Sequence, residues 1–389
     1  MQESFAVPAL DIRLDLGFPG AMVVSTDRVS IAGRAKLADV ARAAKVSLAT
    51  ASRVLNQPQS VRPAARERVL EAVRQLAYTP DRAAQALSSG RSNVVGAVVP
   101  TLGLAIFADA VEALQDGLAE QGYTLLLANT RYDPKRELTQ IKALLQHGVD
   151  GLVLVGDSFD PEVPALINQF GVPCLTTFVA TSHHGFPCIG IDNHEAARTM
   201  AAHMLGLGHR EFGIMANTAL PNDRSQARLA GFLQALKEAG ITSMKDRIVE
   251  VEHPLISSGR KALRQLLRVH SDITAVMCTT DTLAVGAAAE AKRLGIDVPG
   301  MLSISGYDDM EIAAEVDPPL TSVNIPAQQI GRLAADHILM AIGGRHIPVN
   351  TRFAAGQIVR GSTAAVRQAA RPAARKAKSS TAASASVEA

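Results

Sequence analysis

The stretch at residues 36–56, KLADVARAAKVSLATASRVLN, constrains this chain more than any other segment. Apolar side chains recur at helical spacing in its first half, and Ser47 stands where the N-cap of a second helix belongs. Ala51, Val54 and Leu55 would face inward on that second helix, whereas its outward positions are small, polar or cationic. Two short helices around a tight turn, with the second slim enough to enter the major groove, are typical of a helix-turn-helix that reads duplex DNA.

Charge is unevenly distributed along the 389 residues. Residues 34–91 hold eleven Lys and Arg against four Asp and Glu, a net charge of +7, whereas residues 92–364 carry a net charge of −7. A basic head on an acidic body indicates that only the head contacts phosphate. A solvated basic face would look similar, so charge alone leaves both interpretations open.

The cysteine and hydropathy patterns argue against several classes of protein. The three cysteines are isolated and show no CxxC or Cys/His spacing, which indicates a reducing compartment and argues against zinc. No apolar run reaches membrane-spanning length, and Glu3, Asp11 and Asp15 interrupt any secretion signal. We therefore expect a cytoplasmic protein without a membrane segment or a cofactor.

From Val94 onward, short apolar runs bounded by turns alternate with amphipathic helices. This alternation predicts right-handed βαβ units and doubly wound parallel sheets, and the length of the region favours two lobes over one. Ligands in such folds bind at the carboxyl ends of the strands, here in a cleft that closes between the lobes. The predicted strands are 94–99, 125–128, 152–155, 174–176, 188–191, 212–215, 275–278 and 302–307. The predicted helices are 64–77, 107–120, 135–146, 194–205, 224–238, 259–269, 282–293 and 327–342.

Ten ordered motifs carry a resemblance to a known family. They include DVARAAKVSLATASRVLN (39–56), RERVLEAVRQLAYTPDRAAQAL (66–87), GIDNHEAA (190–197), RLAGFLQAL (228–236) and SISGYDD (303–309). Over residues 35–364 the chain resembles the lactose/purine-repressor (LacI) family of bacterial transcription regulators. The resemblance implies a small all-α helix-turn-helix head and an α/β body of two doubly wound, periplasmic-binding-protein-like (type I) lobes. It also implies a homodimer on a near-palindromic operator, controlled by a small metabolite in the interlobe cleft.

The resemblance and the patterns together divide the chain into five predicted segments. These are a flexible N-terminal extension (1–34), a helix-turn-helix DNA-binding domain (35–79), a hinge helix and linker (80–92), a two-lobed effector-binding and dimerisation domain (93–364) and a disordered basic tail (365–389). The helix at 107–120 is a candidate part of the dimer face.

The family match assigns roles to residues of the head and hinge. Leu48 and Ala49 open the recognition helix and, being apolar, would favour a thymine methyl, whereas Arg53 would reach a guanine edge or a phosphate. Leu87 matches a leucine that the family wedges between central base steps, although ordinary helix packing is the alternative. The predicted DNA-binding residues are Ser47, Leu48, Ala49, Thr50, Ser52, Arg53, Asn56, Tyr78, Arg82 and Leu87.

The family match also predicts which residues contact the effector. Arg228 matches the arginine that clamps effector in nearly all members, since a guanidinium binds carboxylates or vicinal hydroxyls bidentately. Asp308 matches an acidic effector contact, and Asp281 is expected to N-cap the helix that follows it. The predicted effector-binding residues are Ile106, Phe107, Phe178, Asn222, Arg224, Arg228, Thr280 and Asp308.

Departures from the family pattern limit what can be said of the ligand. Lys45 replaces a turn glycine, where a left-handed backbone costs a side chain about 1 kcal/mol, and Phe178 replaces a usual aspartate. Two arginines near the cleft are compatible with an anionic ligand such as a sugar acid, unless Arg224 pairs with Asp223 or with a surface carboxylate instead. His183 and His184 are expected to form a solvated loop rather than a metal site.

Two rival interpretations belong to other classes. A solute-binding protein of a transport system would share the two-lobed body but leave residues 36–87 without a purpose. An enzyme on a doubly wound fold would need catalytic groups, and neither a phosphate-binding glycine loop after 94–99 nor a nucleophile–base order stands out.

Overall fold

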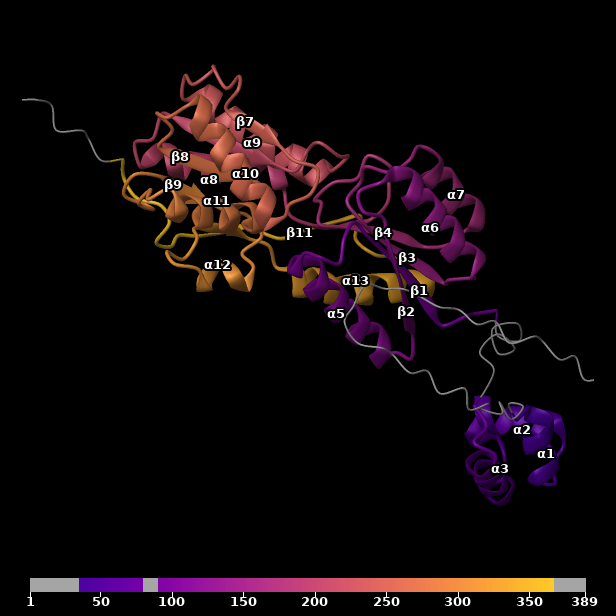
Figure 1. Cartoon of the computed structure of the whole chain (residues 1–389). Coiled ribbons are helices and arrows are strands. Elements are labelled where there is room, and N and C mark those ends of the chain that lie inside the picture. The colour runs from indigo at the N-terminus through magenta and orange to yellow at the C-terminus, as the bar shows by residue number, and fades with distance from the viewer. Residues whose placement is uncertain (1–34, 80–89, 367–389) are drawn as a thin grey trace, which may run out of the picture. The chain divides into compact units, whose positions relative to one another are not determined.

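The computed structural model describes residues 35–79 and 90–366. It separates into two compact units, a helical head and a larger α/β unit, which are described one at a time (Figure 1). The predicted N-terminal extension, hinge helix and basic tail lie outside the described residues, apart from residues 90–92 of the linker and the tail's first two residues.

Within residues 35–79, the head contains three α-helices and a short 3-10 helix around one small core. Their bounds are α1 Leu37–Ala43, α2 Leu48–Asn56, η1 Pro58–Ser60 and α3 Pro63–Gln75. Val40, Ala51, Val54 and Val69 are buried at its centre. Lys45, in the turn between α1 and α2, has a φ of 52°, which confirms the left-handed backbone expected there.

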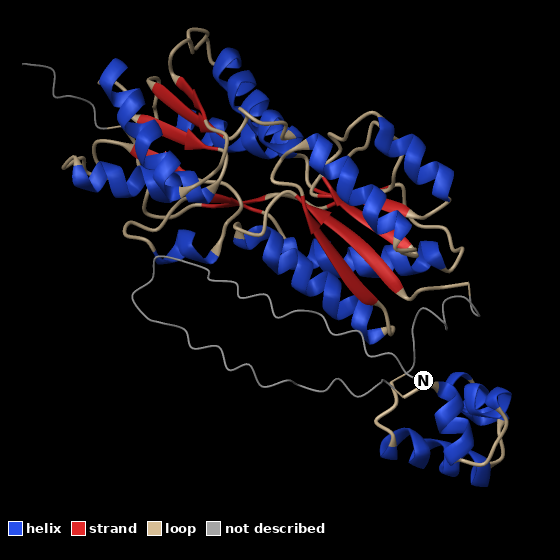
Figure 2. Ribbon diagram, turned by 45° about the vertical axis from the view of Figure 1, so that its right-hand side comes forward, coloured by secondary structure: helices blue, strands red, loops and turns tan. Residues whose placement is uncertain are grey.

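The first lobe of the α/β unit is built on a six-stranded parallel sheet in the order β11-β5-β4-β3-β1-β2. Helices α5 and α13 pack against each other on one face, and α6 and α7 cover the other (Figures 1 and 2). The strands are β1 Val94–Val99, β2 Thr124–Asn129, β3 Gly151–Val155, β4 Cys174–Thr177, β5 Cys188–Gly190 and β11 Asn350–Arg352. The helices are α5 Ala105–Glu120, α6 Pro134–Gln146, α7 Glu162–Phe170 and α13 Ala327–Ile342.

The second lobe repeats this plan on a four-stranded parallel sheet in the order β7-β6-β8-β9. Helices α8 and α9 form one packed pair, and α10 and α11 form the other. The strands are β6 Phe212–Ala216, β7 Ile248–Glu250, β8 Ala275–Cys278 and β9 Ser303–Ser305. The helices are α8 Asn193–Gly206, α9 Asp223–Glu238, α10 Ile256–Val269, α11 Asp281–Arg293 and α12 Glu311–Glu315.

Within residues 90–366 the chain passes between the lobes at three neighbouring places. It leaves the first lobe after β5, returns to it after β10 (Ser322–Asn324), and leaves it again after β11 to form β12 (Gly356–Ile358). Strands β10 and β12 pair antiparallel, and Phe353 N donates to Gly190 O at 2.8 Å. The three connections therefore run side by side.

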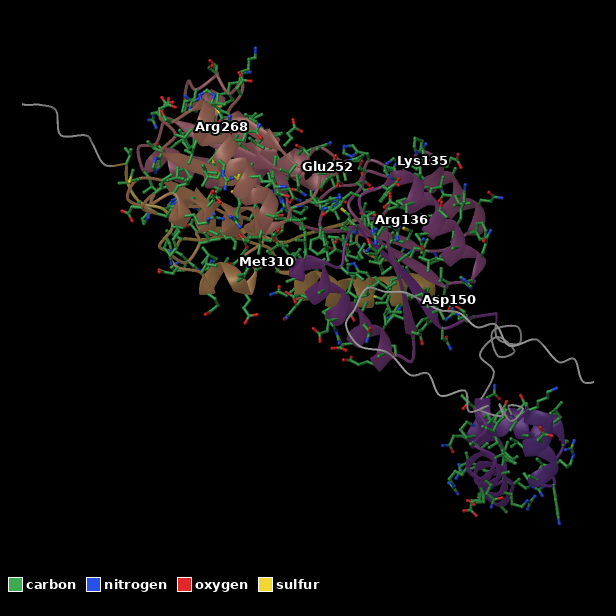
Figure 3. The ribbon with its side chains drawn as sticks, in the orientation of Figure 1. Lys135, Arg136, Asp150, Glu252, Arg268 and Met310 are labelled. Atoms are coloured by element: carbon green, nitrogen blue, oxygen red, sulfur yellow. The ribbon has the colours of Figure 1, made fainter. Side chains whose placement is uncertain are left out.

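The start of the α/β unit is held by hydrogen bonds to the side chain of Asp150. The carboxylate of Asp150, labelled in Figure 3, accepts from the backbone N–H groups of Ser92 and Asn93 and so holds the start of β1.

All three cysteines, Cys174, Cys188 and Cys278, are buried and form no disulfide. Burial raises the pKa of the Cys188 thiol to about 11 and raises the pKa of the other two thiols further.

The predicted fold class is confirmed, and every predicted strand and helix of residues 94–342 is present with small shifts at its ends. Three corrections apply. The helix predicted at 64–77 begins one residue earlier and ends at Gln75. The strand predicted at 302–307 is only three residues long, and η1 lies in the segment expected to be a loop. Elements α7, α12, β7, β10, β11 and β12 were not predicted.

Candidate functional site

Helix α2 presents the residues predicted to read DNA. Leu48 is 54% exposed, and Ala49 and Arg53 are exposed near it. Ser47 caps the helix as predicted, because its hydroxyl oxygen accepts from Thr50 N at 3.1 Å. The hydroxyls of Ser47 and Thr50 lie 2.8 Å apart. The head thus offers a short helix whose outer face is slim and carries one cation.

The other predicted DNA contacts are placed differently. Ser52 is half-buried on α2, and Asn56 ends that helix. Tyr78 is half-buried and packs against the core of the head. Arg82 and Leu87 lie outside the described residues.

In the α/β unit, all eight predicted effector-binding residues line one cavity between the lobes. The cavity contains about 330 Å³ of space, open solvent included. Its first-lobe side is mostly apolar, and its second-lobe side is polar. The full lining is Leu104, Ile106, Phe107, Tyr132, Phe178, Asn217, Asn222, Arg224, Ser225, Arg228, Thr280 and Asp308.

Arg228, on α9, is the centre of the polar wall. Its Nη1 donates to the Asp308 carboxylate at 2.9 Å and to Thr279 O at 2.7 Å, and its Nε donates to Asn193 Oδ1 at 2.9 Å. The guanidinium also lies 3.8 Å from the centre of the Tyr307 ring, a cation–π contact. The two N–H groups of Nη2 have no partner within residues 90–366, so they remain available to a ligand.

Asp308 is the acidic partner of this wall and follows β9 in the chain. It is 3% exposed, and its backbone has a φ of 106°. Burial raises the pKa of its carboxyl to about 6, while the neighbouring Arg228 charge acts in the opposite direction. The Arg228–Asp308 pair is therefore a buried contact with a defined backbone conformation at Asp308, and it differs from an ion pair between flexible side chains at the surface.

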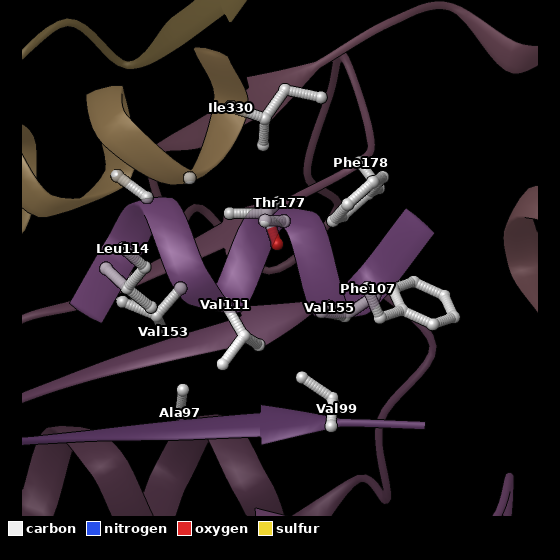
Figure 4. A pocket seen from close by; sticks show the side chains of 13 residues that line it. Ala97, Val99, Phe107, Val111, Leu114, Val153, Val155, Thr177, Phe178 and Ile330 are labelled. Carbon is white, nitrogen blue, oxygen red and sulfur yellow. The ribbon is translucent and has the colours of Figure 1, made fainter. Parts of the chain in front are cut away.

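The apolar wall is built around two aromatic rings. Phe107 and Phe178 meet edge to face, with ring centres 5.3 Å apart. The same two rings line a second cavity of about 320 Å³ inside the first lobe, between the sheet and helices α5 and α13 (Figure 4). Phe178 has a φ of 65°, and its carbonyl accepts from Asn193 Nδ2 at 2.9 Å. Because Asn193 also binds Arg228, it joins the two walls.

Arg224 touches both lobes. Its Nη1 binds the Asp223 carboxylate at 2.8 Å, so the pairing left open above is the one that occurs. The other oxygen of Asp223 accepts from Asp157 N, on the first lobe, at 2.6 Å. Gly156 has a φ of 86°, and a Cβ there would collide with Arg224 Nη1. The absence of a side chain at Gly156 is what lets the lobes approach.

The prediction that Asp281 caps α11 is wrong. Thr280 is the N-cap, with its hydroxyl accepting from Leu283 N, and it lines the cavity. Asp281 is fully buried in the first turn, where it accepts from Ser322 Oγ at 2.6 Å and from Met310 N at 2.8 Å. Burial raises the pKa of Asp281 to about 8.

Comparison with known proteins follows from these two sites. A family model described as "Bacterial regulatory proteins, lacI family" matches residues 36–81. One described as "Periplasmic binding proteins and sugar binding domain of LacI family" matches residues 92–368. The chain belongs to the LacI family. It is a transcription regulator of that family with a helix-turn-helix head.

Relatives of the LacI family span nearly the whole chain. The regulator GntR of Escherichia coli K12 is 31% identical over 81% of this chain and 94% of its own length. The repressor CytR of the same strain is 32% identical over 85% and 97%. A solved structure of the lac repressor dimer, bound to operator and the anti-inducer ONPF, is 26% identical and covers 86% of this chain and all of its own, with a TM-score of 0.76.

Sequence reasoning missed several residues that border the cavity of this LacI-family chain. Asn217 directly follows β6, and Ser225 lies in the first turn of α9, so the rule that ligands bind at strand ends would have found both. Tyr132 lies in the loop between β2 and α6, where no family motif pointed.

Three further observations concern the His183 side chain, metal binding and membrane-spanning helices. The His183 ring, 88% exposed, binds the buried Asp157 carboxylate at 3.0 Å. Over residues 35–79 and 90–366, no group of three or more His, Cys, Asp or Glu is placed to hold a metal ion. In the same residues no helix is both long and apolar enough to cross a membrane.

Proposed function

We propose that this LacI-family regulator is a ligand-responsive repressor that acts in the cytoplasm. It binds a near-palindromic operator as a homodimer, and it senses a sugar or sugar acid in the cleft between its lobes. The observation that carries the proposal is the convergence of eight predicted contacts, from five separate segments of both lobes, on one cavity.

The head supports operator binding. The exposed positions Leu48 and Ala49 suit apolar contacts with thymine methyls, and Arg53 suits a guanine edge or a phosphate. The relative of known structure was solved as a dimer on operator, which motivates the same assembly here. In this scheme Leu87 inserts between base steps at the centre of the site and opens the minor groove.

The cavity supports a polyhydroxylated effector. Its apolar side, with Phe107 and Phe178, suits the C–H face of a sugar, and its polar side offers donors and acceptors for hydroxyl groups. The free Nη2 donors of Arg228 suit a carboxylate or a pair of hydroxyls. Closure of the lobes around this ligand would change the spacing of the two head segments and hence the affinity for DNA. A coupling of about 1–3 kcal/mol is typical of such switches.

Selection of binding sites from a randomised duplex library, with the full chain, tests the DNA half. We expect a near-palindromic consensus, weakened more than tenfold by Arg53→Ala. Arg74→Ala is the matched control, since Arg74 is an exposed arginine of the same head, paired with Glu71. Failure to enrich any sequence would contradict the proposal.

A deletion of residues 1–91 separates the proposal from its main rival. The remaining α/β unit should keep its thermal stabilisation by ligand and lose all sequence-specific DNA binding. A solute-binding protein of a transport system would instead show no sequence-specific DNA binding as the full chain.

Leu87→Ala should weaken specific binding while leaving non-specific binding nearly unchanged. Equal loss of both would count against the wedge.

A further inference from the structure

Next to the effector cavity lies a second compartment, a hollow with about 330 Å³ of space when open solvent is included. It is formed at the carboxyl ends of β1, β2 and β3, with Pro100, Thr130 and Ser158 among its lining. Tyr132 and Arg224 line both hollows, so these two side chains stand at the boundary between them. A ligand that passes this boundary would reach the edge of the first-lobe sheet.

The two compartments differ in the charges that line them. The effector cavity is lined by two guanidinium groups and one carboxylate. The second compartment is lined by three carboxylates, those of Asp133, Glu137 and Asp223, and by the guanidinium of Arg224 alone. Asp133 and Asp223 are engaged as the cap of α6 and as the partner of Arg224. The carboxylate of Glu137, in the first turn of α6, has no hydrogen-bond partner within residues 90–366.

Glu137 and Tyr132 line the second compartment with polar side-chain atoms that no protein group binds within residues 90–366. Glu137 is half-buried, and burial raises the pKa of its carboxyl to about 7, with Arg224 lowering it and Asp223 and Asp160 raising it. The Tyr132 side chain is only 8% exposed, and its hydroxyl bonds to nothing in the described part of the unit. These polar atoms stay accessible from the compartment, so a ligand with matching groups can form hydrogen bonds with them.

The loop that carries Tyr132 is built to hold it there. Arg131 and Tyr132 have φ values of 56° and 60°, an uncommon conformation for two successive side-chain-bearing residues. Bonds from Arg136 Nε to Asn129 O and from Asp133 N to Thr130 O close the loop on both sides. The backbone strain is thus held in place beside the boundary of the two compartments.

We propose that the effector spans both compartments, with its hydrogen-bond acceptors at Arg228 and a hydroxyl or ammonium group at Glu137. In its ionised form the Glu137 carboxylate only accepts hydrogen bonds, and a facing ammonium group would favour that ionised form. The Tyr132 hydroxyl bonds the ligand where it crosses between the two. The ligand class is a sugar or sugar acid that carries an acidic or hydroxylated end and a donor-rich, preferably amino-substituted, end. This inference rests on the proposed effector site.

Calorimetric titration of the full chain with four probes tests it: D-glucose, D-glucosamine, D-gluconate and D-glucosaminate. We expect the tightest binding from D-glucosaminate, which carries both a carboxylate and an ammonium group. Glu137→Gln, an isosteric change, should weaken that binding at least tenfold. In this variant the affinities of D-glucosamine and D-glucose should agree within twofold, and so should those of D-glucosaminate and D-gluconate. Tyr132→Phe should weaken it about threefold. Glu162→Gln, a carboxylate 68% exposed on the same lobe, is the matched control and should change nothing.

The outcomes separate the two proposals. Binding that depends on Arg228 but is the same in Glu137→Gln and the wild type would overturn the second compartment and leave the effector cavity intact. Binding of amino probes that survives both Glu137→Gln and Tyr132→Phe would also overturn it. A full chain that binds none of the four probes would overturn this inference together with the sugar-class effector.

Discussion

The buried ion pair of Arg228 and Asp308 yields the sharpest prediction on stability. Both side chains are nearly inaccessible to water, at 7% and 3% exposure, and their N–O distance is 2.9 Å. Arg228→Met would leave Asp308 as a buried carboxylate without its counter-charge. Breaking a buried pair from one side costs about 3–5 kcal/mol, because the remaining charge is uncompensated. For a unit of this size that corresponds to a fall of roughly 6–20 °C in the melting temperature.

A double-mutant cycle measures how much of this cost belongs to the pair. Asn is the suitable replacement at position 308, because it tolerates positive φ and removes the charge. We expect Arg228→Met with Asp308→Asn to lose at least 2 kcal/mol less than the sum of the single variants, within the range of coupling seen for contacting residues. Urea unfolding followed by far-ultraviolet circular dichroism provides the free energies. Additivity within about 0.5 kcal/mol would refute the reasoning.

The same pair makes a prediction about pH. The folded pKa of Asp308 is about 6, above its ordinary value. A carboxyl with a raised folded pKa contributes stability at low pH that is lost as the pH rises through the folded value. The penalty of Arg228→Met should therefore be smaller at pH 5 than at pH 8. A penalty that is equal at the two values would show that the lost cation–π contact with Tyr307 outweighs the charge.

Three further substitutions have expected outcomes. Ser47→Ala removes the cap of α2 and should cost the head about 1 kcal/mol in thermal unfolding; an unchanged melting temperature would contradict the capping role. Gly156→Ala places a Cβ against Arg224 at a φ of 86°, so the amide of Asp157 should exchange its hydrogen faster, and unaltered exchange would count against a contact between the lobes there. Asp281, whose folded pKa is about 8, should make the wild type less stable as pH rises from 4 to 8, a slope that Asp281→Asn should reduce when melting temperatures are compared.

How much of the fold was predictable depended on burial. Strands such as β1 and β8 are continuous apolar runs inside parallel sheets, and such runs can be recognised in the sequence. Strands β7, β11 and β12 are three residues long and partly exposed, so their composition differs little from that of loops. Their pairing is decided by the chain around them.

The predicted part of the cavity was found through the family motifs. Residues in RLAG and GYDD were found through the family match, and the structure brings them together. The segment TTDT allows either Thr280 or Asp281 to cap α11, and only the backbone conformation of Thr280, with φ −150° and ψ 153°, decides between them. Tyr132 and Asn193 escaped notice because their importance comes from burial between segments far apart in sequence.

The three neighbouring connections between the lobes restrict how the two lobes can move. A rotation about an axis that crosses all three segments changes their torsions by similar amounts. A sideways rotation would stretch one segment while compressing another, and it would have to break the β10–β12 pairing and the bond from Phe353 to Gly190. These bonds therefore oppose every other rotation of the lobes more strongly than the rotation about that axis, so a distance measured across the cleft is the natural readout of their movement.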